Sequence, residues 1–211
     1  MNTVRIYDIT RPLGAATAPW PADAPFSIRW RWRLERGNPV NLSSLSLSPH
    51  VGTHVDAPLH VREGMEGIGE MNLEPFIGPA RVIRVLPDAS GRITSASLGS
   101  VDLASPPRVL LRTDTCPDPS AWNPAFAALA PETARLLSSR GALLVGVDTP
   151  GIDPFTSKDL PAHRILADAG VRWIENLDLG GVEPGVYELV ALPLRMPGAD
   201  ASPVRAVLVQ R

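Results

Sequence analysis

Residues 48–60 read SPHVGTHVDAPLH and hold three of the four histidines of the chain. The even-numbered positions carry His50, His54, Asp56 and His60, whereas the odd-numbered positions are largely apolar. Alternate side chains of an extended chain point to opposite faces, so the stretch predicts a polar site on one face and a core on the other. Imidazole and carboxylate are the ligands that zinc and similar ions take, so the pattern indicates a metal site.

The four-residue spacing of His50 and His54 would also suit one face of a helix, as in zinc proteases of the HExxH type. The local sequence argues against a helix, because Gly52, Pro58 and the β-branched residues between the histidines disfavour one. A fully extended path fails too, since it separates the histidines by about 13 Å, whereas zinc–nitrogen bonds are about 2 Å long. The chain must therefore bend, and Gly52 is the residue that permits the bend.

Length and composition favour a small enzyme-like body. The 211 residues suit one domain, residues 1–211. A net charge of −2 gives no electrostatic reason to expect nucleic acid or an anionic membrane as a partner. The single cysteine, Cys116, excludes an internal disulfide and makes a thiolate metal site improbable. The sequence holds no long apolar run, so we expect a soluble cytoplasmic protein.

Apolar runs alternate with two helical segments along the rest of the chain. Helices are predicted at 131–140, with Gly141 as the stop, and at about 158–169, with Ser157 as the N-cap. We expect Gly64 to Gly69 to form an exposed loop. Strands are predicted at 5–9, 26–34, 42–48, 80–86, 108–112, 142–147, 171–177, 187–195 and 203–210. This order predicts an α/β fold with a mixed β-sheet core and few helices.

Three residues outside the histidine stretch are candidates for the site. His163 lies in the second predicted helix and Glu175 near the end of the strand that follows it. From the residues alone they could equally be an ordinary helix histidine and a solvated glutamate. Trp20 stands between Pro19 and Pro21. Its ring either covers an edge of the core or offers a preset stacking surface.

Residues 50–60 (HVGTHVDAPLH), the Trp20-Pro21 passage ending in Phe26, the Asp148-Thr149-Pro150 loop and the late His163 and Glu175 resemble the cyclase-like family of metal-dependent amidohydrolases. Within that family the chain is most similar to the bacterial kynurenine formamidases, or arylformamidases. The resemblance covers nearly the whole chain and implies a swivelling β/β/α fold. Ala22 departs from the glycine usual at that position, which leaves the local loop conformation open.

The resemblance also implies roles for the residues. It implies two zinc ions per chain, with manganese or another divalent ion as the alternative. His50, His54 and Asp56 would bind one ion, Asp56 and His163 the other, and Glu175 both. His60 would be the catalytic acid/base, Trp20 would contact the substrate, and the protein would be a homodimer.

The expected reaction is hydrolysis of N-formyl-L-kynurenine to L-kynurenine and formate, a step of tryptophan breakdown. Bound metal lowers the pKa of water to about 7, and the chain has no G-x-S-x-G nucleophile motif. Two alternatives stay open. One is a hydrolase that opens lactams, like isatin hydrolase, or another small amide on the same site. The other is a metal-binding protein without turnover, which coordinatively saturated metals would favour.

Overall fold

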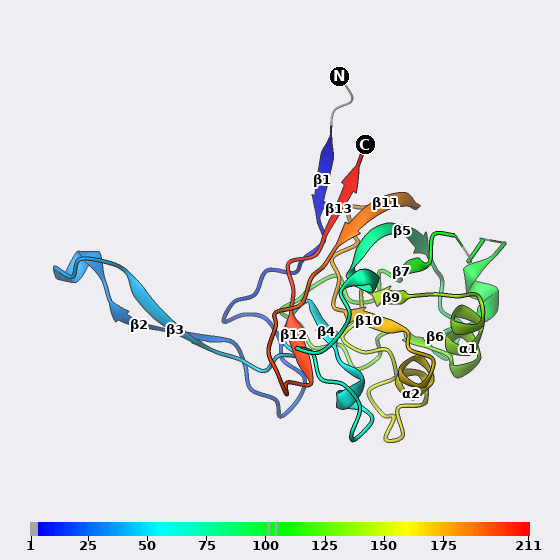
Figure 1. Cartoon of the computed structure of the whole chain (residues 1–211), viewed down its shortest axis with the longest axis horizontal. Coiled ribbons are helices and arrows are strands. Elements are labelled where there is room, and N and C mark those ends of the chain that lie inside the picture. The colour runs from blue at the N-terminus through cyan, green and yellow to red at the C-terminus, as the bar shows by residue number, and fades with distance from the viewer. Residues whose placement is uncertain (1–3, 101, 104) are drawn as a thin grey trace.

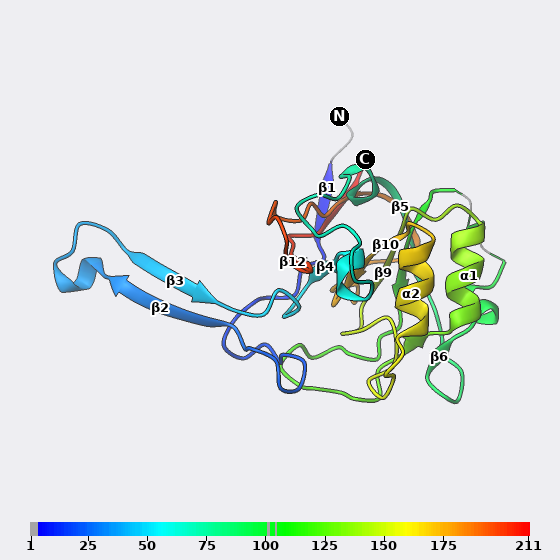
Figure 2. The same cartoon turned by 60° about the horizontal axis from the view of Figure 1, so that its bottom comes forward.

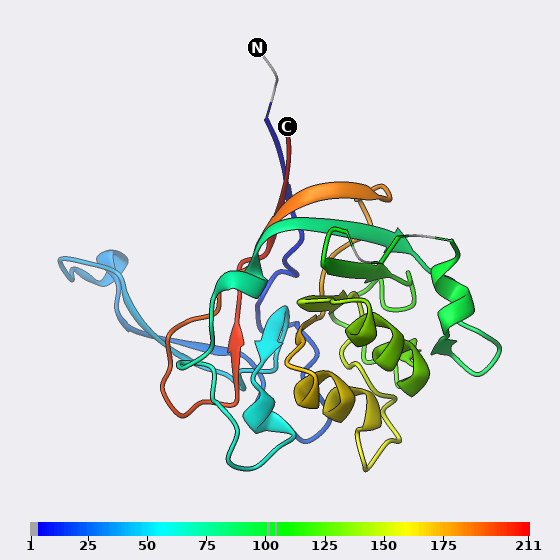
Figure 3. The same cartoon turned by 45° about the vertical axis from the view of Figure 1, so that its right-hand side comes forward.

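A mixed sheet of nine strands forms the body of the molecule in the computed structural model, which describes residues 4–100, 102–103 and 105–211. Figure 3 shows that this sheet is strongly curled. Its spatial order is β1 (Arg5–Asp8), β13 (Val207–Gln210), β11 (Gly185–Val190), β5 (Ile77–Arg84), β7 (Arg108–Arg112), β9 (Leu144–Val147), β10 (Arg172–Glu175), β4 (His54–Asp56) and β12 (Ala201–Pro203). The predicted mixed sheet with few helices is confirmed.

The central strands β5, β7, β9 and β10 are parallel, and the flanking pairs are antiparallel. Helix α1 (Pro131–Ser139) connects β7 to β9, and helix α2 (Pro161–Asp168) connects β9 to β10. Both helices pack side by side on one face of the sheet (Figure 2). Both crossovers step in the same direction along the sheet, from β7 to β9 to β10, which places their helices on the same face. Helix α2 packs against β10, the strand that carries Glu175.

Two hydrophobic clusters lie on opposite faces of the sheet. Val109 and Leu111 of β7 pack with the helices, whereas Leu110 between them packs in the cluster on the other face. This alternation follows from the two-residue period of a strand. Because both faces of the central strands are covered, β7 and β9 consist largely of apolar residues, as a strand buried on both faces requires.

A two-stranded ribbon projects from the body (Figure 1). It consists of β2 (Ser27–Trp32) and β3 (Leu42–Ser46), joined through the 3-10 helix Leu34–Arg36 and a turn at Gly37. These strands pair only with each other, and all six residues of β2 are exposed. We call residues 27–46 the arm. The sequence predicted both strands but not that they leave the sheet.

The remaining elements are short. Strands β6 (Arg92–Ile93) and β8 (Ala128–Leu129) form a separate parallel pair. The 3-10 helices are Pro58–His60, Glu74–Phe76 and Ser95–Leu98. The loop 64–69 is only partly exposed, because Ile68 is buried in the core. In the part of the chain that the structure describes, neither α-helix has the length and apolar composition to cross a membrane.

Helix α2 begins later than predicted. Proline lacks an N–H and its ring clashes with the preceding turn, so it is favoured at the first helical position and disfavoured inside. The helix accordingly starts at Pro161, with Leu160 as the N-cap residue in a left-handed conformation at φ 45°. The predicted N-cap role of Ser157 is wrong. Its hydroxyl instead accepts a hydrogen bond from the Leu160 N–H at 3.2 Å.

Candidate functional site

Gly52 turns the chain between His50 and His54. Its φ of +71° is a left-handed conformation that favours glycine, and His54 begins β4 two residues later. The predicted bend is therefore confirmed. The predicted continuous extended face is wrong, because only His54–Asp56 is a strand and Pro58–His60 is a 3-10 helix. His50 precedes β4 in the chain and His60 follows it. The turn and the 3-10 helix bring the two rings together, with their centroids 4.4 Å apart.

Strand β10 brings Glu175 next to His54. The antiparallel register pairs Glu175 with His54 and Trp173 with Asp56, and directly paired residues lie side by side on one face. Trp173 Nε1–H donates to Asp56 Oδ2 at 2.9 Å, and the Ile152 N–H donates to Glu175 Oε1 at 2.9 Å. Each carboxylate therefore has one oxygen held by the protein, while its other oxygen faces His54.

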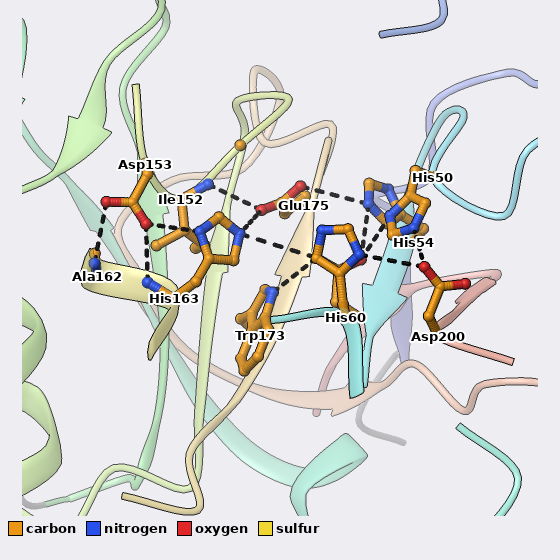
Figure 4. Close-up of polar contacts among 12 residues, drawn as sticks. His50, His54, His60, Ile152, Asp153, Ala162, His163, Trp173, Glu175 and Asp200 are labelled. Carbon is orange, nitrogen blue, oxygen red and sulfur yellow. Dashed lines mark hydrogen bonds and ion pairs between the residues drawn. The ribbon is translucent and has the colours of Figure 1, made fainter. Parts of the chain in front are cut away.

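Helix α2 supplies His163 from the opposite side (Figure 4). Its Nε2 lies 3.0 Å from Glu175 Oε1 and 3.9 Å from Asp56 Oδ2, and its Nδ1 lies 2.7 Å from Asp153 Oδ2. When Nδ1–H donates to Asp153, Nε2 presents its lone pair to the site. Asp153 also accepts hydrogen bonds from the N–H groups of Ala162 and His163. One carboxylate thus fixes the start of the helix and the ring that the helix carries.

The donor atoms around Asp56 have the spacing of a metal site. Asp56 Oδ1 lies 3.0 Å from His50 Nδ1 and 3.2 Å from His54 Nε2, and His54 Nε2 lies 3.4 Å from Glu175 Oε2. Ligand atoms on one tetrahedral zinc ion, with bonds of about 2.0 to 2.1 Å, are about 3.3 Å apart. Donor atoms of His54, Asp56 and Glu175 lie within 4.8 Å of one another, as do those of His50, Asp56 and His60. Asp56 belongs to both groups, so its carboxylate is the common point of a site that could hold metal ions.

Two buried atoms in this group have no hydrogen bond. His54 Nε2 and Asp56 Oδ1 are both without a partner, although their separation is short. His54 Nδ1 lies 2.9 Å from the Gly52 carbonyl oxygen, so Nδ1–H donates there and Nε2 keeps a lone pair. A lone pair that faces two carboxylate oxygens is repelled unless a cation lies between them. This donor set therefore fits a bound divalent ion.

Without a metal, protons supply the missing positive charge. Burial opposes charge on His54, but the Asp56 and Glu175 carboxylates raise the pKa of His54 to about 10. Burial likewise opposes charge on His163, whereas its hydrogen bonds to Asp153 and Glu175 raise its pKa to about 10. Burial would raise the pKa of Asp56, yet the facing histidines hold it well below its usual range. The cluster therefore attracts cations, whether protons or metal ions.

A cavity of about 460 Å³ opens over the cluster. His50, His54, Asp56, His60, His163 and Glu175 line its polar end. Trp20, Trp122 and Phe155 line the other end, with Trp20 4.9 Å from Trp122 and 5.5 Å from Phe155 between ring centroids. Trp20 therefore faces the site rather than capping a distant edge of the core. A cavity of this size and composition suits a small aromatic molecule.

Backbone strain is concentrated around this cavity. Four described residues other than glycine have positive φ, and three of them, Ala22, Leu160 and Asn176, line the cavity. Ala22, at φ 72°, is the position where the resemblance leads one to expect glycine. Such conformations cost about 1 to 3 kcal/mol each and persist where the surrounding structure imposes them.

All seven residues singled out from the sequence line this one cavity. Five further residues escaped sequence reasoning: Asp153, Trp173, Asp200, Trp122 and Phe155. Asp153 lies in a loop at the carboxyl end of β9, where α/β proteins place binding groups, so a signal for it existed. Asp200 and Trp122 are far from the motif in sequence, and only tertiary pairing brings them to it.

Comparison with known proteins gives one consistent result. The family model described as "Putative cyclase" matches residues 7–154. The chain is 46% identical over 204 residues to the kynurenine formamidase of Bordetella petrii, which covers 97% of each chain. It is 45% identical to the kynurenine formamidase of Polaromonas naphthalenivorans, over 98% of this chain and 92% of that one.

Solved structures share the fold. A predicted metal-dependent hydrolase from Bacillus stearothermophilus superposes with a TM-score of 0.85 at 29% identity, covering 99% of this chain and 100% of that one. Isatin hydrolase A from Ralstonia solanacearum superposes with a TM-score of 0.80 at 23% identity, covering 99% and 92%. At that identity, the second likeness shows a common fold alone.

Proposed function

The chain belongs to the cyclase family, and from this premise we propose that it is a metal-dependent formamidase that hydrolyses N-formyl-L-kynurenine to L-kynurenine and formate. The observation that carries the proposal is the convergence of His50, His54, Asp56, His163 and Glu175 at one end of a cavity whose other end is aromatic. The full-length likeness to kynurenine formamidases supports this substrate. The reaction would be a step of tryptophan breakdown.

The protein binds a divalent metal, and we assign two zinc ions to each chain. His50, His54 and Asp56 would hold one ion, Asp56 and His163 the second, with Glu175 reaching both. The spacing of the donor atoms and the unmatched lone pair on His54 support this assignment. When bound, such ions polarise a carbonyl group and lower the pKa of water to about 7.

The chain's own residues orient the substrate and move the proton. Trp20, with Trp122 and Phe155 beside it, offers ring faces for an anilide. His60 lies at the polar end of the cavity with its side chain 30% exposed. We assign it as the acid/base that takes a proton from the attacking water and delivers it to the departing aryl amine.

We also propose that residues 1–211 form one domain and that two copies form a dimer. The pairing of β1 with β13 joins both ends of the chain in one sheet, which supports the single domain. The arm supports the dimer, because an isolated two-stranded ribbon is at best marginally stable in water and this one exposes Ile28, Trp30, Trp32, Leu42 and Leu45.

One purified, zinc-loaded sample tests the function. Turnover of N-formyl-L-kynurenine is compared with ring opening of isatin, and bound metal is measured by elemental analysis. We expect faster turnover of formylkynurenine and a metal-to-chain ratio near two. Faster opening of isatin would make the chain a lactam hydrolase, and full metal occupancy without turnover of either compound would make it a metal-binding protein.

A further inference from the structure

We propose that Asp200 is a positioning residue that holds His60 and His50 through a single carboxylate oxygen. The role of His60 in this proposal rests on the proposed function. Asp200 Oδ2 lies 3.2 Å from His60 Nδ1 and 3.0 Å from His50 Nε2 (Figure 4). His50 precedes β4 in the chain and His60 follows it, and Asp200 lies 140 residues after His60. One distant carboxylate therefore ties together both ends of the histidine stretch.

The backbone of Asp200 is fixed against the same stretch. Strand β12 begins at the next residue and pairs Ala201 with Asp56, and the Ala57 N–H donates to the Asp200 carbonyl oxygen at 2.8 Å. Asp200 is thus anchored by the strand that carries Asp56. Its side chain extends from a rigid element toward the histidines of residues 50–60, as a positioning residue requires.

The loop 64–69 supports this segment from behind. A Cβ on Gly69 would lie 2.6 Å from the Pro197 backbone nitrogen, and a Cβ on Gly67 would lie 3.0 Å from the Ala199 carbonyl oxygen. The Ile68 N–H donates to that same carbonyl oxygen at 2.8 Å. Such close approach is open only to glycine. The segment that carries Asp200 is therefore clamped between this loop and β4.

The contacts fix the tautomers of both rings. When His60 Nδ1–H donates to Asp200, His60 Nε2 keeps its lone pair, and Figure 4 shows that nitrogen on the side facing Glu175 and His163. When His50 Nε2–H donates to the same oxygen, His50 Nδ1 keeps its lone pair toward Asp56 Oδ1, 3.0 Å away. Asp200 thus prepares one ring for proton transfer and the other for metal binding.

This arrangement supplies what hydrolysis of a formamide requires. A water proton moves to His60 Nε2 as the new C–O bond forms at the formyl carbon and the carbonyl π pair moves onto the carbonyl oxygen. That pair re-forms the C=O bond as the C–N bond breaks, and the same proton passes to the nitrogen of the departing aryl amine. Between the two transfers His60 is an imidazolium, and the negative charge of Asp200 on its other nitrogen stabilises that form. No proton is gained or lost by Asp200 itself.

Steady-state kinetics of Asp200 variants test the proposal. In Asp200→Ala we expect kcat to fall about 10- to 100-fold, part of the effect of an acid/base group, with KM within about twofold and partial recovery in Asp200→Glu. The part of the effect that acts through His60 should disappear in a His60→Ala background, because coupled residues are not additive, and the loss that remains acts through His50. Asp8→Ala is the matched control, since the Asp8 side chain is 43% exposed and paired with Arg205, against 44% exposure for Asp200. An equal loss in both backgrounds would overturn the proposal.

A second measurement does not depend on turnover. Nitrogen-15 NMR of the histidine rings, with His60 assigned from His60→Ala, reports which nitrogen carries the proton. We expect the Nδ1–H form in the wild type and a shift toward the Nε2–H form in Asp200→Ala. An unchanged tautomer would overturn the role of Asp200 even in an active enzyme. If the wild type leaves formylkynurenine intact but the tautomer shifts, the proposed substrate fails and the positioning role stands.

Discussion

At the scale of single residues, the site depends on two buried carboxylates that require positive charge. Asp56 and Glu175 are both buried and face histidines whose pKa values they raise, to about 10 for His54 and for His163. A raised pKa means that the metal-free folded protein keeps these protons at neutral pH. They stabilise it fully below the ordinary histidine pKa of 6.5, and that stabilisation is lost as the pH rises through about 10.

Metal binding must therefore displace protons. We expect about two protons to be released when zinc fills the metal-free site at pH 7.5, and affinity to increase as the pH rises toward 10. Calorimetry in buffers of different ionisation enthalpy measures the release directly. His54→Ala should release fewer protons and bind more weakly. Binding without proton release would show that the histidines of the metal-free site are neutral, contrary to these pKa values.

His60 differs from His54 and His163 because its hydrogen-bond partner is Asp200, whose side chain is 44% exposed, rather than a buried carboxylate. We expect His60→Ala to keep its metal and to lose turnover by about 10²- to 10⁴-fold, the range for general acid/base groups. Elemental analysis and steady-state kinetics on the same sample check both parts. His54→Ala serves as the comparison that should lose metal. If His60→Ala loses metal to the same extent, His60 is a ligand.

Trp20 offers a ring face that Pro19 and Pro21 hold at little cost in conformational entropy. Aromatic pairs contribute about 0.5 to 1.5 kcal/mol beyond burial, so Trp20→Ala should lower kcat/KM for formylkynurenine by about tenfold. Metal content should not change, because Trp20 contacts Trp122 and Phe155 rather than the donor atoms. Leu86→Ala, which shortens a highly exposed side chain outside the cavity, is the control. An unchanged kcat/KM would remove Trp20 from the substrate site.

At the scale of elements, the sequence predicted both helices and most strands. It merged β12 and β13 into one strand at 203–210, although they lie near opposite edges of the sheet, and it misassigned the residue that caps α2. The start of α2 shows the reason. Ser157 has the composition of an N-cap, yet the carboxylate of Asp153, eight residues before the first helical residue, accepts the N–H groups of Ala162 and His163. A cap supplied by a residue outside the first turn leaves no local sequence pattern, because it depends on how the loop after β9 folds back over the start of α2.

Asp153 therefore both caps the start of α2 and orients the His163 ring. In Asp153→Asn we expect the free energy of unfolding to fall by about 1 to 3 kcal/mol, because a buried charge-assisted hydrogen bond to His163 is lost. Metal affinity should fall about 10- to 100-fold as the His163 ring loses its orientation. Denaturant titration and metal competition measure the two effects. Asp159→Asn, on an exposed carboxylate of the same loop, should change neither. Unaltered metal affinity would separate Asp153 from the site.

Five of the seven predicted site residues, His50, His54, Asp56, His60 and Trp20, could be found because their chemistry is local: ligand types at short spacing, a glycine bend and a proline-flanked tryptophan. His163 and Glu175 carry no local signal and were assigned through the family resemblance. The partners that orient these residues could not be found from the sequence, because Asp200 and Trp173 meet the motif only through the registers of β12 and β10 with β4. The arm escaped for a different reason. The alternation of apolar and polar residues that predicts a strand is the same whether the strand joins the main sheet or forms a separate ribbon.

At the scale of the whole molecule, the arm is the element whose apolar side chains remain exposed to solvent in a single chain. Leu42 and Leu45 are three residues apart on β3 and so lie on opposite faces. Each pairs with an apolar residue of β2, Trp32 and Ile28 respectively. Both faces of the ribbon therefore expose apolar side chains to solvent. Such surfaces mark interaction sites, and a ribbon apolar on both faces suits a groove rather than a flat surface.

The charge of the arm favours a second copy of the chain as its partner. Residues 27–46 hold four arginines and one glutamate, a net charge of +3, which leaves −5 on the rest of a chain whose net charge is −2. In the proposed dimer, these opposite charges would favour contact between the arm of one copy and the body of the other. Replacing the apolar residues should weaken the dimer while leaving the body folded, because the arm contributes no residue to either core cluster.

We expect the double variant Ile28→Ser, Trp30→Ser to sediment as a monomer at concentrations where the wild type is a dimer, and its melting temperature to become independent of concentration. Leu86→Ser, which changes an apolar side chain of 76% exposure outside the arm, is the matched control and should remain dimeric. Added salt should weaken the wild-type dimer, since screening reduces the attraction between the basic arm and the acidic body. A double variant that dimerises as tightly as the wild type would place the interface elsewhere, and the exposed tryptophans of the arm would then require a different partner.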